Sequence, residues 1–112
     1  MKANDSRFLL VYVPHRFEVL DRDFERYRAA YGWTQQNTDR DAVRERLRQV
    51  AADIGFPLLD LTAALRAADH GVLGGPYYHY DEHWNITGHA VAAAELKRFM
   101  AKQGWIAAPA AE

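Results

Sequence analysis

The side chains best suited to chemistry lie close together, between positions 79 and 89. This segment reads His-Tyr-Asp-Glu-His-Trp-Asn-Ile-Thr-Gly-His and holds three of the five histidines in the chain. In an extended segment, residues two positions apart point to the same side, so Asp81 and His83 can meet. The carboxylate can accept a hydrogen bond from one imidazole nitrogen and leave the other nitrogen to act as a base. The spacing therefore predicts two members of a Ser-His-Asp triad.

Other roles for the same segment stay open. His79, Asp81 and His83 alternate, and two imidazoles with one carboxylate are the ligands of an open zinc site or a facial iron site. Asp81 can instead be a turn residue that bonds nearby backbone amides, with His83 bonded to a carbonyl group. Tyr80 and Trp84 are candidates for substrate contact, although Trp84 can equally pack beneath the loop because a helix follows it.

The sequence offers no obvious nucleophile for the Asp81 and His83 pair. Ser6 is the single serine, and the absence of cysteine excludes disulfides, thiolate metal sites and a cysteine nucleophile. Ser6 precedes the first apolar run, whereas a nucleophile has to lie within hydrogen-bond reach of its base. We therefore expect the catalytic serine to be missing from this chain, and the isolated chain to be inactive.

Composition excludes several classes of partner. The 14 Lys and Arg residues nearly balance the 15 Asp and Glu residues, so nothing favours nucleic acid, anionic lipid or a strongly acidic substrate. The apolar run at 8–13 is too short for a membrane span or a signal sequence, and no cleavage site follows it. The compartment stays open, including export of a longer parent protein. Because Met1 lies only a few residues before a strand, we expect the chain to start inside a larger protein.

Six secondary-structure segments are expected to position these residues. Continuous apolar runs predict a buried strand at 8–13 and a second strand at 57–61. Helical spacing of apolar residues, with a glycine after three of the segments, predicts helices at 21–31, 39–54, 62–68 and 87–103. We expect caps at Asp21, Thr62 and Thr87, with Asn85 as a further candidate for a cap or for a residue that organises the loop. The inward face of the last helix is expected to carry Val91 or Ala92, Leu96, Phe99 and Met100.

The order of these segments predicts an α/β domain with a parallel strand pair and a right-handed crossover. A loop rich in glycine and tyrosine is expected at 70–80, and a flexible tail at 107–112. The 112 residues leave room for one domain, over 1–112. Two strands are too few for a covered sheet. Either further strands are missing, or copies of the chain pair through open sheet edges as a homo-oligomer.

The segment after the loop has the pattern Asp81-x-His83-Trp84-Asn85-x-x-Gly88-His89, and an alanine-rich stretch predicted to form an amphipathic helix follows it. This segment resembles the last conserved block of SGNH (GDSL-like) hydrolases. Residues 57–65 and the opening Leu-Val-Tyr-Val-Pro run are similar to segments that precede this block in the family. The familiar motif has the Asp three residues before the His. The spacing of two found here is similar to that of branches resembling polysaccharide O-acetyltransferases.

The resemblance implies that the chain is the carboxy-terminal part of a flavodoxin-like, three-layer α/β hydrolase domain. It implies His83 as general base, Asp81 as the residue that orients it, and a serine supplied by an earlier block. The implied reaction is ester hydrolysis or acyl transfer on a small acyl ester or an acetylated carbohydrate, without a metal or organic cofactor. A noncatalytic module that binds a partner or self-associates through its strand edges is the alternative from a different functional class.

Overall fold

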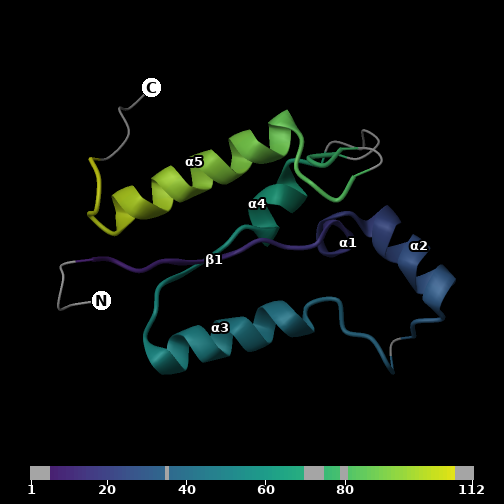
Figure 1. Ribbon diagram of the computed structural model, residues 1–112. Helices are drawn as coiled ribbons and strands as arrows, with labels where there is room; N and C mark the ends of the chain where they lie inside the picture. Colours follow the sequence, from purple (N-terminus) through teal and green to yellow (C-terminus); the bar gives the residue numbers. More distant parts are fainter. Residues whose placement is uncertain (1–5, 35, 70–74, 79–80, 108–112) are drawn as a thin grey trace. The chain divides into compact units, whose positions relative to one another are not determined.

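A computed structural model describes residues 6–34, 36–69, 75–78 and 81–107 of the chain (Figure 1). These residues form a mixed α/β structure with two short parallel strands and five helices. In chain order the elements are β1 (Leu10–Tyr12), α1 (Arg16–Val19), α2 (Asp21–Tyr31), α3 (Ala42–Ile54), β2 (Leu58–Asp60), α4 (Thr62–Ala67) and α5 (Ile86–Lys102). The chain divides into a first compact unit, Met1–Asp60, and a second, Leu61–Glu112.

The two strands lie in the first unit and pair in parallel, which confirms the predicted pairing. The partners in register are Leu10 with Leu58, Val11 with Leu59, and Tyr12 with Asp60. Val11 is 37% exposed, so the prediction of a fully buried first strand is wrong. The physical reason is the small size of the sheet, because the described part of the chain gives β1 a single neighbouring strand.

Helices α2 and α3 confirm the helical periodicity of the sequence. Each ends at a glycine in the left-handed conformation, Gly32 at φ 67° and Gly55 at φ 88°, which glycine adopts at little cost. Asp21 is the first residue of α2 and not its cap, since Leu20 takes the cap position. The sequence does not predict α1, because four residues are too few to show a period. His15 caps α1 by accepting a hydrogen bond from the Phe17 amide.

A buried ion pair joins α1 to α2 in the first unit. The guanidinium of Arg16 contacts the carboxylate of Asp23, and both side chains are buried. Val19 and Leu20, at the junction of the two helices, are buried as well. Charges taken out of water are tolerated when each satisfies the other, so this pair fixes the angle at which α2 leaves α1.

In the second unit, α4 contacts α5, and Leu61, Leu65 and Tyr77 are buried. The prediction that Thr62 caps α4 is wrong, because Leu61 holds the cap position and Thr62 is already helical. The prediction that Leu96 faces inward is wrong too, since its side chain is 37% exposed.

Parts of two predicted segments lie outside the described residues. Of the loop expected at 70–80, the structure describes 75–78. Of the tail expected at 107–112, it describes Ala107.

Candidate functional site

The Asp81 and His83 segment is held in place by two backbone hydrogen bonds to the residues before it. Tyr77 and Trp84 form an antiparallel bridge. The Tyr78 amide donates to the His83 carbonyl at 3.1 Å, and the Asn85 amide donates to the Pro76 carbonyl at 3.0 Å. The segment around His83 is thus tied to residues 76–78 and leads directly into α5, the longest helix described.

Asn85 fastens this loop to α5 through both ends of its side-chain amide. The oxygen accepts a hydrogen bond from the Gly88 amide at 3.0 Å, which makes Asn85 the N-cap of α5. The nitrogen donates to the carbonyls of Gly75 at 2.8 Å and Tyr77 at 3.1 Å. The prediction that Thr87 caps this helix is therefore wrong. Asn85 caps it because its amide bonds the helix and the loop at once.

Gly88 allows the loop to approach α5 closely. A Cβ atom at this position would lie 2.3 Å from the Pro76 carbonyl oxygen and 2.7 Å from the Trp84 Cβ. Only a residue without a side chain fits between these atoms. The glycine in the sequence pattern is therefore a packing requirement, which keeps the Trp84 backbone against the first turn of α5.

Asp81 and His83 are brought together by this loop. Asp81 Oδ1 accepts the His83 backbone amide at 2.7 Å and also contacts His83 Nδ1. A carboxylate beside Nδ1 requires a proton on that nitrogen, so neutral His83 carries its lone pair on Nε2. The side chains are 52% exposed for Asp81 and 85% exposed for His83. The imidazole is thus oriented by a carboxylate and open to solvent.

The other side chains predicted for this site are placed less fully. Trp84 is half-buried, and its ring meets the His89 ring edge-on with centroids 5.5 Å apart. Its Nε1 atom is buried and has no hydrogen-bond partner among the described residues. Substrate contact by Trp84 stays a prediction. His79 and Tyr80 lie outside the described residues, so the roles predicted for them stay predictions as well.

The nucleophile and the metal site are the two remaining expectations. Ser6 is exposed, lies in the first unit and precedes β1. Within the described ranges, no group of three or more His, Cys, Asp or Glu side chains is placed to hold a metal ion. The metal alternative needs His79 together with Asp81 and His83, and it stays a prediction because His79 is not described.

A second polar cluster, which was not predicted from the sequence, lies at the carboxyl ends of the two strands. Tyr12 donates its phenolic proton to Glu18, whose carboxylate also accepts the His15 amide at 2.6 Å. Burial, and then the hydrogen bond to Glu18, raise the pKa of the Tyr12 phenol above its ordinary value. Arg44 bridges Asp60 at 3.3 Å and Asp41 at 3.2 Å. The signal that was available is that Tyr12 and Asp60 each lie one residue before the end of a predicted parallel strand.

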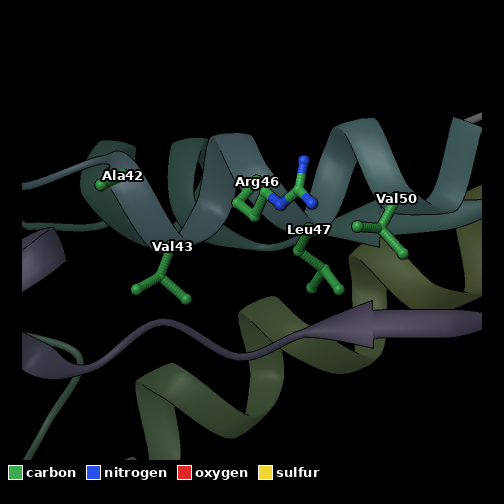
Figure 2. Close-up of a pocket in the computed structure, with 5 residues that line it drawn as sticks. All are labelled: Ala42, Val43, Arg46, Leu47 and Val50. Carbon is green, nitrogen blue, oxygen red and sulfur yellow. The ribbon is translucent and has the colours of Figure 1, made fainter.

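An open apolar hollow of about 400 Å³ lies along α3 in the first unit. Its lining consists of Ala42, Val43, Arg46, Leu47 and Val50, and Figure 2 shows the valine and leucine side chains extending from the helix. Val43 is 69% exposed. The lining residues of the hollow include no nucleophile and no acid–base pair.

Comparison of the chain with protein-family models, with curated proteins and with solved structures gives no match. None of the helices in the described ranges is long and apolar enough to span a membrane. Any assignment of function therefore depends on the geometry of the side chains and on the sequence pattern around His83.

Proposed function

We propose that this chain supplies the general base and its orienting carboxylate to an SGNH-type ester hydrolase or acyltransferase. A serine hydroxyl attacks the ester carbonyl, and its proton passes to His83 Nε2. His83 then returns this proton to the leaving alkoxide, while Asp81 holds the proton on Nδ1 and stabilises the imidazolium. The observation that carries the proposal is the contact of Asp81 Oδ1 with His83 Nδ1.

The environment of the pair supports this role over that of a turn aspartate alone. Asp81 Oδ1 does accept a backbone amide, as a turn residue would, but the same oxygen also meets the imidazole. Because the His83 ring is 85% exposed, its Nε2 atom is open to a serine and an ester. A base of this kind contributes roughly 10²- to 10⁴-fold to the rate of a proton transfer.

The proposal includes a serine from outside this chain. Ser6 is the single serine and precedes β1, whereas an activated serine has to lie within about 3 Å of its base. We place the chain in the carboxy-terminal part of a flavodoxin-like, three-layer domain. The parallel β1 and β2 pair, separated in sequence by α1, α2 and α3, is the kind of unit from which such domains are built. The substrate class is a small acyl ester or an acetylated carbohydrate.

Hydrolysis of p-nitrophenyl acetate tests the Asp81 and His83 pair, because an imidazole can hydrolyse this activated ester slowly even when no serine nucleophile is present. Without the serine, triad catalysis is expected to be absent, and we expect only the slow hydrolysis that an imidazole alone supports. This rate should be largely lost in His83→Ala and reduced about tenfold in Asp81→Asn. His15→Asn is the matched control, since His15 is an exposed histidine whose capping role an asparagine retains. Equal losses in the His83 and His15 variants would contradict the proposal. Loss of turnover in Ser6→Ala would contradict the proposal that the catalytic serine comes from outside this chain.

A second candidate function is a noncatalytic module that self-associates, and one observation favours it. The apolar stripe of α3 is exposed at Val43 and Ile54, to 69% and 59%. Both strands of the described sheet also have an open edge. Exposed apolar surface beside unpaired strand edges is typical of surfaces that associate.

A further inference from the structure

Aromatic side chains gather on the surface of the first unit, away from the Asp81 and His83 segment in sequence. Phe17 in α1 lies within 6.2 Å, centroid to centroid, of Phe24, Tyr27 and Trp33. His15 meets Phe17 at 4.6 Å. Neither the proposed reaction nor the strand pairing uses these rings, so their clustering calls for a separate explanation.

Three of the rings form a nearly parallel set. Tyr27 and Tyr31 are 5.9 Å apart and inclined by 15°, and Trp33 lies 6.0 Å from Tyr27 at 13°. Tyr31 and Trp33 are 5.7 Å apart at 25°. We call Tyr27, Tyr31 and Trp33 the aromatic platform. Unlike the perpendicular walls of a cage for a cation, these rings share one orientation and suit a flat ligand.

The backbone builds this platform from residues near the end of α2. Tyr27 and Tyr31 are four positions apart and lie on one face of the helix. Gly32 then ends the helix in the left-handed conformation, and the Trp33 amide bonds the Arg28 carbonyl at 3.0 Å. This turn brings the Trp33 ring back against both tyrosines. After it, Asn37 accepts the Thr34 amide at 2.7 Å, which holds the loop.

The platform is open to solvent on its outer side. Tyr31 is 66% exposed, and Tyr27 and Trp33 are half-buried. The Tyr31 ring is thus left largely uncovered by the described residues, and its apolar face can take part in contact with a ligand. The exposed area of the platform is therefore available to a ligand.

The charges around the platform indicate a neutral ligand. Helix α2 carries three acidic and three basic residues, Asp21, Asp23, Glu25, Arg22, Arg26 and Arg28. Several are already paired, including Arg28 with Glu25 at 2.9 Å and Asp23 with Arg16. Binding of a nucleic acid strand to stacked aromatic rings needs a net positive groove as well. The balance of charge here disfavours nucleic acid.

We propose that the aromatic platform binds a neutral carbohydrate through the flat face of a pyranose ring. One face of a pyranose presents polarised C–H groups, which the electron-rich face of an aromatic ring attracts. The hydroxyl groups of the sugar project away from the stacked face. The exposed side chains of Thr34 and Asn37, which follow the platform in sequence, are candidates to form hydrogen bonds with them. This site goes beyond the proposed function and does not depend on it, because it uses no residue of the Asp81 and His83 segment.

Titration of the whole chain with cellohexaose and with maltohexaose, followed by NMR, tests this site. We expect saturable shifts of the Trp33 indole signal with at least one of the two neutral sugars. Tyr31→Ala should weaken binding roughly three- to tenfold, whereas Tyr31→Phe should stay within about twofold of the natural chain. Alanine is the best helix former, and Tyr31 is exposed, so the Ala variant should fold. Val43→Ala, an exposed apolar change on α3, is the control and should bind normally.

Four results would overturn the carbohydrate site. The first is the absence of any saturable shift at Trp33 with either sugar. The second is equal binding by the Tyr31→Ala and natural chains, which would place the sugar elsewhere. The third is a shift of the same Trp33 signal on dilution without sugar, which would assign the platform to contact between two copies. Binding of a thymidine oligonucleotide in preference to both sugars would likewise replace carbohydrate with nucleic acid. Esterase activity does not enter any of these outcomes.

Discussion

At the scale of single residues, Tyr12 links the stability of the first unit to pH. Its phenol donates to the buried carboxylate of Glu18, and its raised pKa means that the folded chain retains this proton more tightly than the unfolded chain. As the pH rises through the ordinary tyrosine value of 10.0, the unfolded chain loses the proton first. The free energy of unfolding therefore falls with rising pH, by at most about 1.4 kcal/mol for each pH unit.

Urea unfolding between about pH 8 and about pH 11 checks this linkage. At the lower pH, Tyr12→Phe should be less stable than the natural chain by about 1 kcal/mol, because the hydrogen bond to Glu18 is lost. The difference should shrink as the pH rises. Glu18→Gln is the control, since it removes the carboxylate charge and should make the decline less steep. A constant difference between the Tyr12→Phe and natural chains across this range would contradict the linkage.

The residue scale also shows which contacts a sequence can predict. Asp81 and His83 are two positions apart, so their contact is local and could be predicted. The prediction used an extended backbone, whereas the structure forms the contact in a bend where Asp81 also accepts the His83 amide. Glu18 meets Tyr12 only because the chain turns into α1 after the strand, and Arg44 meets Asp60 from another element. Such contacts depend on where the elements pack, which neither spacing nor composition reveals.

At the scale of elements, variants at the start of α5 test whether Asn85 or Thr87 caps this helix. Asn85→Ala should lower the free energy of unfolding by about 1–2 kcal/mol, because it removes the cap of Gly88 and two bonds to loop carbonyls. Thr87→Ala should change it by less than about 0.5 kcal/mol, since Thr87 is exposed and already helical. Thermal unfolding of the two variants gives both values.

The opposite order of these two effects would restore Thr87 as the cap. A loss of similar size in both variants would mean that both side chains stabilise this end of α5, because alanine is the best helix former and causes no loss through helix propensity. Asn85→Asp separates the two functions of the side chain, because aspartate can still accept from Gly88 but cannot donate to the Gly75 and Tyr77 carbonyls. We expect its stability to lie between those of the Asn85→Ala and natural chains.

Helix ends marked by glycine were the most predictable feature of the elements. Gly32 and Gly55 take the left-handed conformation that few other residues adopt, so each glycine predicts where the helix before it ends, α2 and α3 respectively. Starts were less predictable, because Asp21, Thr62 and Thr87 all have capping side chains but lie one or two residues inside their helices. Several residues near a helix start can cap it, and only the direction of the incoming chain selects one.

At the scale of the whole molecule, apolar periodicity predicted the elements but not what covers them. The stripe of Val43, Leu47, Val50 and Ile54 gives α3 its helical pattern, yet both ends of the stripe are exposed. Periodicity reports that a helix has an apolar face. Burial of that face depends on the surface opposite it, and the described sheet of two three-residue strands is small.

Light scattering over a range of concentrations tests whether a second copy covers this face. If the chain self-associates through α3 and the strand edges, its mass should rise with concentration toward twice the 12.8 kDa of one chain. Val43→Glu should keep the mass at that of one chain, because a carboxylate would have to lose its water in the contact. Gln49→Glu adds the same charge on another side of α3 and should still associate. A mass of one chain at every concentration would contradict self-association and leave the apolar face of α3 to a partner of different sequence.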